Sequence, residues 1–83
     1  MAMKTAASVD TSRIVALARA RRLAESGAAR TIRQGAGLSL REIAIASDVG
    51  LATASRWERA QRSPRGEGAI RWAAVIDALA KSV

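Results

Sequence analysis

The chain has 83 residues and contains neither cysteine nor histidine, which excludes disulfides, thiolate metal sites, zinc sites and histidine-dependent catalysis. Twenty alanines and almost no β-rich segment predict an all-α fold in a single domain. Fourteen basic and seven acidic residues give a formal net charge of +7. This charge indicates an anionic partner, most simply nucleic acid. The alternative is a soluble protein whose charge only reflects an arginine-rich genome.

The N-terminal segment, MAMKTAASVD, has one lysine and no long apolar core, so we expect no signal peptide. We expect these residues, 1–10, to form a disordered tail ahead of a folded domain over 11–83. No stretch of the chain approaches the ~20 apolar residues of a membrane span. The sequence therefore predicts a soluble, cytoplasmic protein that does not act at a membrane.

The first predicted helix begins near Asp10–Ser12, where three good N-cap residues stand together, and runs to Glu25. Ile14, Leu17 and Ala18 fall on one face of this helix. It is an N-terminal addition to the helices that follow. Its role is open between packing onto them, which we favour, mediating dimerisation, and laying its arginines along DNA.

The second predicted helix covers residues 28–34 and ends at Gly35-Ala36-Gly37, because glycine tolerates the left-handed conformation of a helix C-terminus. Ser39 begins the third. Glu42 follows three residues later, and the two form the signature of a capping box. The inner face of this third helix repeats with helical spacing at Leu40, Ile43 and Ala44.

The tight polar turn Asp48-Val49-Gly50 separates the third helix from a fourth over residues 52–59, with Trp57 inward. A polar connection over 61–67 and a last helix over 68–80 follow. The residues of this last helix that are available for packing are Ala69, Trp72, Ala73, Ile76, Leu79 and Ala80. Two short helices around a tight turn, over about 39–59 and followed by arginines, are the arrangement that a helix-turn-helix uses to read DNA.

Several residue types occur in a telling order: Arg33, then Ile43-Ala44, then Glu58, then the basic loop Arg59–Pro64. In this order and spacing, residues 28–79 resemble the lambda-repressor/Cro family of helix-turn-helix domains, also called the XRE family. The resemblance implies a compact, lambda-repressor-like bundle of about five helices. The chain departs from the family pattern at two positions, with Asp48 where the turn usually has glycine and Ala54 where a β-branched core residue is usual.

The resemblance also implies an ion pair between Arg33 and Glu58. This pair would tie the helix over 28–34 to the end of the helix over 52–59, which is the recognition helix of the motif. A guanidinium and a carboxylate suit this role because both are bidentate. The alternative is two unrelated surface charges. The small side chain of Ala44 suits the close approach of two crossing helices.

The start and outer face of the recognition helix are expected to face the duplex. The candidate base-reading residues are Leu51, Ala52, Ser55 and Arg56. Arg56 is the first choice because arginine donates two hydrogen bonds to guanine, whereas Leu51 could instead be a core residue. The candidate phosphate contacts are Ser39, Arg41, Gly50, Thr53, Arg59, Arg62 and Arg65.

The sequence predicts a sequence-specific transcription regulator, similar to small phage or prophage repressors, that binds double-stranded DNA in a bacterial or phage-infected cell. We expect no catalysis, because no nucleophile–base pair exists, and no cofactor, metal or small-molecule ligand. An antitoxin or a recombination directionality factor on the same fold is an alternative, as is a protein-interaction module that does not bind DNA. A homodimer and a monomer on an asymmetric site are both compatible with the sequence.

Overall fold

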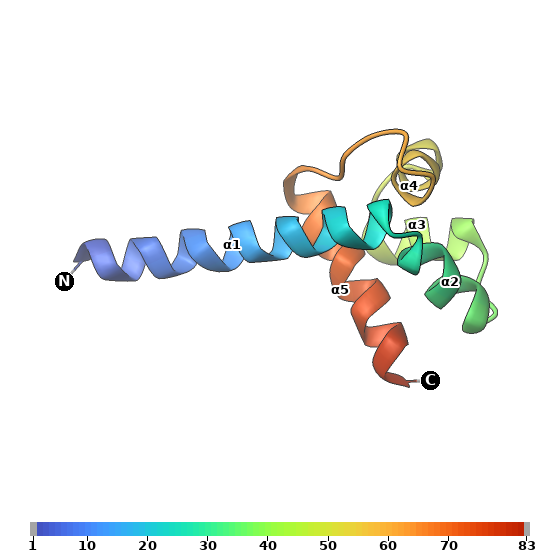
Figure 1. Ribbon diagram of the computed structural model, residues 1–83, viewed down its shortest axis with the longest axis horizontal. Coiled ribbons are helices and arrows are strands. Elements are labelled where there is room, and N and C mark those ends of the chain that lie inside the picture. Colours follow the sequence, from blue (N-terminus) through green and yellow to red (C-terminus); the bar gives the residue numbers. More distant parts are fainter. Residues whose placement is uncertain (1, 83) are drawn as a thin grey trace.

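The computed structural model describes the backbone of residues 2–82 and the side chains of residues 11–82; within this range the chain forms five helices and no strand. The helices are α1 (Ala2–Glu25), α2 (Ala28–Gly35), α3 (Leu40–Ser47), α4 (Leu51–Glu58) and α5 (Gly66–Ser82). The C-terminal half of α1 packs across α5, and α2, α3 and α4 gather at the same end of α1 (Figure 1). The predicted all-α bundle with a helix-turn-helix and an additional N-terminal helix is confirmed.

α1 begins at Ala2, earlier than the capping residues predicted, and Asp10–Ser12 lie inside it. Residues that cap a helix well also fit within one at small cost, so capping propensity alone does not set the start. The expectation of a disordered tail over residues 1–10 falls outside the residues whose side chains the structure describes, and it stays a prediction.

The face of α1 that enters the core matches the apolar face seen in the sequence in part. Leu17 packs half-buried against the core and Ala20, Leu23 and Ala24 are buried, whereas Ile14 is 64% exposed. The C-terminal half of α1 crosses the bundle (Figure 1). Where the bundle contacts the helix therefore decides which residues are buried, and in an alanine-rich helix the large apolar residues alone do not show this.

The junction between α2 and α3 forms as the sequence predicts. Gly37 adopts the left-handed conformation, with φ of 73°, as the chain leaves α2. The Ser39 hydroxyl then accepts a hydrogen bond from the Glu42 N–H at 3.1 Å, and the Ser39 N–H donates to Glu42 Oε1 at 2.8 Å. This backbone hydrogen bond from Ser39 lowers the pKa of the Glu42 carboxyl. The capping box fixes the start of α3.

The bounds of α4 and α5 differ slightly from those predicted. α4 covers Leu51–Glu58 rather than 52–59, and α5 begins at Gly66 rather than Gly68. In α5, Glu67 stands in the first turn, where a negative charge is favourable, and it forms an ion pair with Arg13 of α1. The polar connection before α5 is correspondingly shorter than expected.

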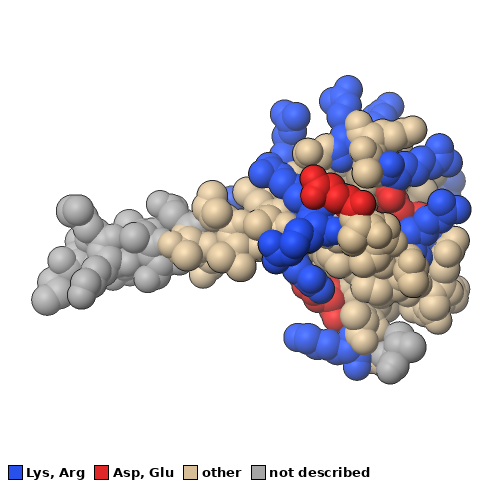
Figure 2. Space-filling model, in the orientation of Figure 1, with Lys and Arg blue, Asp and Glu red and all other residues tan. Residues whose placement is uncertain are grey.

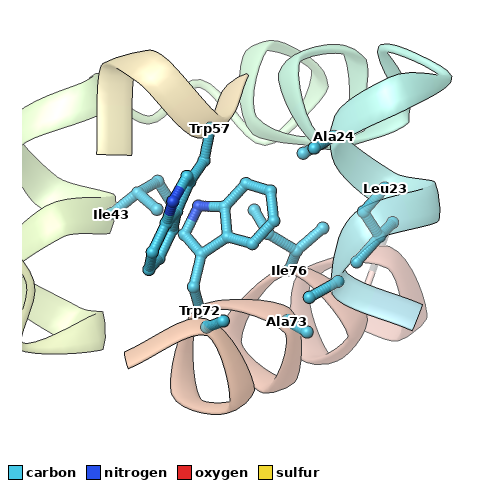
Figure 3. Packing of buried hydrophobic residues seen from close by; sticks show 10 residues of the cluster. Leu23, Ala24, Ile43, Trp57, Trp72, Ala73 and Ile76 are labelled. Atoms are coloured by element: carbon cyan, nitrogen blue, oxygen red, sulfur yellow. The ribbon is translucent and has the colours of Figure 1, made fainter. Parts of the chain in front are cut away.

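One hydrophobic core includes residues of all five helices. At its centre the rings of Trp57 from α4 and Trp72 from α5 meet edge to face, with centroids 5.6 Å apart and planes at 62° (Figure 3). Trp72 is completely buried, and Leu23, Ile43 and Ile76 surround the two rings. Small residues line the remaining helix contacts, where they let backbones approach closely: Ala20, Ala24, Ala29, Ala69 and Ala73. Of the residues of α5 predicted to pack, Ala80 is exposed.

Polar contacts join α1 to α5 and to the loop before α5. Arg19 forms a two-pronged ion pair with Asp77, with its shortest N–O distance 2.7 Å. Arg13 pairs with Glu67, and Arg21 donates to the carbonyl oxygen of Pro64 at 3.0 Å. The described part of α1 therefore packs onto the bundle with much of its positive charge bound internally.

The end of α4 places an alanine in a conformation that costs free energy. Ala60 has φ of 59°, and the Gln61 N–H reaches back to the Arg56 carbonyl at 2.8 Å. A left-handed alanine is strained because its Cβ approaches the neighbouring carbonyl.

We expect Ala60→Gly to raise the free energy of unfolding by about 0.5–1 kcal/mol, measured by urea denaturation. Ala36→Gly is the matched control, since Ala36 has φ of −83° and gains nothing from glycine. Equal destabilisation of both variants would contradict strain at Ala60.

Candidate nucleic-acid interface

The turn between α3 and α4 takes the shape that a helix-turn-helix requires. Asp48 ends α3 with φ of 56° and ψ of 48°, the left-handed conformation for which glycine is usual at this position. The N–H of Val49 donates to the Ala44 carbonyl at 3.0 Å, and Gly50, in extended conformation, begins α4. The turn thus leaves the start of α4 exposed.

α4 has one buried and one exposed face. Its buried residues are Ala54, Trp57 and Glu58. The exposed face carries Ala52 and Arg56, which stand one turn apart. Arg59, which ends the helix, is exposed and continues this face one further turn along. A helix that presents an alanine and two arginines outward has both the flat surface and the donors needed in a major groove.

The other candidate base-reading residues lie at the borders of this face. Leu51 is 41% exposed at the first position of α4, which favours the duplex-facing interpretation over the core one. Ser55 and Thr53 are half-buried. The exposed apolar start of α4 can contact thymine methyl groups.

An open hollow of about 240 Å³ lies between α4 and the loop that follows it. Its lining residues are Thr53, Arg56, Trp57, Arg62, Ser63 and Arg65. Three guanidinium groups and two hydroxyls thus surround one concave surface with the Trp57 ring. This donor set matches a phosphodiester, since arginine binds phosphate with paired charge-assisted hydrogen bonds. Arg56 lies both on the exposed face of α4 and at this hollow, so its side chain can reach a base or a phosphate.

The arginines of the chain divide into a bound set and a free set. Arg13, Arg19, Arg21, Arg33 and Arg71 each contact a carboxylate or a carbonyl. Within residues 11–82, no side-chain hydrogen bond or ion pair engages the remaining arginines on or near the helix-turn-helix, which are Arg41, Arg56, Arg59, Arg62 and Arg65. Figure 2 shows basic side chains projecting from the top of the body, where Figure 1 places α4 and the following loop. Most of the arginines without a side-chain partner in this range therefore lie on or near the helix-turn-helix, and the others are Arg22 on α1 and Arg30 on α2.

The predicted phosphate contacts at the start of α3 are less free than those around the hollow. The hydroxyl and the N–H of Ser39 are both engaged by Glu42 in the capping box. Arg41 is exposed, one residue into α3. A phosphate at this helix start would thus depend on Arg41 and on Gly50 across the turn, and these contacts stay predictions.

Arg33 and Glu58 form a forked ion pair. Arg33 Nε donates to Glu58 Oε2 at 2.7 Å and its second terminal nitrogen to Oε1 at 2.8 Å. The remaining Arg33 nitrogen donates to the Leu38 carbonyl at 2.8 Å. The two side chains are only 14% and 7% exposed, and the hydrogen bond with Glu58 raises the pKa of Arg33. The pair joins α2 to the last residue of α4.

The structure adds a residue to the motif that the sequence did not indicate. Arg71 of α5 donates to the carbonyls of Ser47 and Asp48, at 2.8 and 3.1 Å, and so contacts the turn itself. These acceptors are 24 and 23 residues away along the chain. No local pattern signals such a contact, because backbone carbonyls are present at every position.

Comparison with known proteins agrees with this geometry. The model of a family described as helix-turn-helix matches residues 30–78, from α2 to the second half of α5. The chain therefore belongs to the XRE-type, lambda-repressor/Cro-like family of helix-turn-helix domains, which is a family of DNA-binding domains and not a class of enzymes. Neither the curated proteins nor the solved structures include a match to the chain.

The described residues lack two other kinds of feature. No helix there combines the length and apolar character needed to cross a membrane. The same residues hold no group of three or more acidic side chains that could bind a metal ion.

We expect Glu58→Ala to lower the free energy of unfolding by about 2–4 kcal/mol, because it leaves the buried Arg33 guanidinium without its counter-charge. Denaturation by urea measures this. Asp77→Ala is the control, since the Arg19–Asp77 side chains are 43% and 34% exposed. An exposed pair contributes only about 0–1 kcal/mol. Similar small losses in both variants would show that the Arg33–Glu58 pair does not anchor α4.

We expect Arg56→Ala to weaken binding to a preferred DNA site by about 1–3 kcal/mol and to relax the preference at one base pair. Competition binding with a set of single-base variants of the site measures both effects. Arg62→Ala is the control, because Arg62 lines the hollow and should weaken preferred and scrambled duplexes equally. An equal loss on both duplexes for Arg56→Ala would assign Arg56 to phosphate alone.

Proposed function

We propose that the chain is a sequence-specific DNA-binding transcription regulator of the small phage or prophage repressor type. α4 enters the major groove with Ala52 and Arg56 toward the bases. The phosphates beside it are held by the arginines of the hollow and by Arg59. A bound copy near a promoter would act by occupying the site, since no second domain is needed for this.

The observation that carries this proposal is the division of the arginines. The arginines on α1 and α2 that pair with carboxylates are bound within the fold, whereas those around α4 are left free at one surface. Free charge gathered beside an exposed recognition helix is what a sequence-specific duplex binder requires.

The test is selection of bound duplexes from a random library, followed by affinity measurements on the winner and on a scrambled control across a salt series. We expect a defined motif bound at least about a thousandfold more tightly than the control. If about six phosphates are contacted, the log–log slope of affinity against salt should be near −5.

The outcomes separate the proposal from its alternatives. A palindromic motif would show that two copies bind, and an asymmetric motif that one copy does. Placing the motif over a promoter in a reporter should lower expression. Weak binding without a motif would contradict the proposal and would favour a protein partner for the same fold.

A further inference from the structure

A side chain of α5 hydrogen-bonds to the turn of the helix-turn-helix. The Nε of Arg71 donates to the Ser47 carbonyl at 2.8 Å, and a terminal nitrogen of the same guanidinium donates to the Asp48 carbonyl at 3.1 Å. The planar guanidinium can bridge two adjacent acceptors in this way, which a single-point donor such as lysine cannot. One side chain thus spans the last residue of α3 and the residue that turns the chain.

These two carbonyls are among those that the helix itself leaves without donors. The last carbonyls of any α-helix lack intrahelical partners. At the end of α3, the N–H groups of Asp48 and Val49 satisfy Ile45 and Ala44. Arg71 supplies hydrogen bonds for the Ser47 and Asp48 carbonyls, and its positive charge also suits the negative end of the α3 dipole. Asp48 adopts the left-handed conformation, which glycine adopts more readily than aspartate, so this turn benefits from an external donor.

Gly68 allows α5 to lie close enough to the turn for these hydrogen bonds. A Cβ on Gly68 would stand 2.8 Å from the Val49 side chain, closer than real contacts allow, and 3.5 Å from the Trp57 ring. Gly68 lies one turn before Arg71, on the same side of α5. α5 therefore approaches the turn closely through its glycine, and the arginine one turn later reaches the carbonyls.

The turn between α3 and α4 determines where α4 begins. Gly50 follows it directly as the N-terminal boundary of α4, and Leu51 and Ala52 are the first exposed residues of that helix. A shift of the Ser47–Asp48 backbone would move these residues with it. Misplacement by about 1 Å is enough to lose well-aligned hydrogen bonds.

We propose that Arg71 is a positioning residue for DNA recognition: by holding the Ser47 and Asp48 carbonyls it fixes the turn, and through the turn the angle at which α4 enters the groove. This inference rests on the proposed function. Arg71 does not itself need to touch DNA for this role.

The test compares Arg71→Met, which keeps an apolar stem but removes the donors, with the native chain in two measurements. The first is amide hydrogen exchange in the free protein at Asp48 and Val49, whose N–H groups donate to the Ile45 and Ala44 carbonyls at the turn. We expect about tenfold faster exchange there, since hydrogen bonds from a charged group are lost, and unchanged exchange in the α1–α5 core. The second is affinity for the selected and the scrambled duplex, where we expect the ratio between them to fall about tenfold.

Lys81→Met is the charge-matched control, because this substitution also removes one positive charge from α5. Lys81 lies in the last turn of α5, at the end of the helix away from the turn between α3 and α4 (Figure 1). Arg71→Met that matches this control in both measurements would overturn the inference. Equal weakening on both duplexes, with native exchange at the turn, would overturn it too, since Arg71 would then be a phosphate contact. If Arg71→Met does not fold, Arg71→Lys keeps the charge without the fork, and native behaviour of that variant would overturn the role.

Failure of the inference and failure of the proposed function give different results. A native chain that does not distinguish the selected from the scrambled duplex contradicts sequence-specific regulation, and the DNA part of the role falls with it. Hydrogen exchange in the free protein still decides whether Arg71 fixes the turn.

Discussion

The recognition helix must be held rigidly through one face only. α4 has eight residues, too few to be stable alone in water, and its other face has to stay open for DNA. Trp57 carries most of the anchoring, because its ring is buried against Trp72 at the centre of the core. Ala54 lets the helix approach closely, and Glu58 is tied to α2 by a forked ion pair. The remaining structure serves largely to keep this single contact face in place.

The second feature of the molecule is how it distributes positive charge. α1 carries arginines along an exposed helix, but three of them are held by Glu67, Asp77 and a loop carbonyl. Arg33 is held by Glu58 and Arg71 by the turn carbonyls. Among residues 11–82, pairing of this kind leaves most of the arginines without side-chain partners on α3, α4 and the loop after α4, which favours electrostatic attraction of a duplex toward α4.

Sequence reasoning succeeded where local chemistry decides the outcome. The capping box at Ser39 and the glycine end of α2 follow from residue types at fixed spacing. The partnership of Arg33 with Glu58 came from the resemblance to a family, since nothing local joins residues of different helices. The buried face of α1 was found only in part, because Leu17 packs against the core but Ile14 is exposed, and contact with the bundle decides which apolar residues are covered. Arg71 and Ala60 were missed because a bond to a distant carbonyl and a strained alanine leave no pattern.

The central claim is that DNA meets the exposed face of α4 and the basic loop beside it. The most direct measurement is an NMR titration of isotope-labelled protein with the selected duplex, followed at each backbone amide. The account predicts that the largest chemical-shift changes lie at residues 50–56 and in the loop over 59–65, with little change in the part of α1 that packs on α5. Changes concentrated on α1 or on the end of α5, with α4 unaffected, would contradict it.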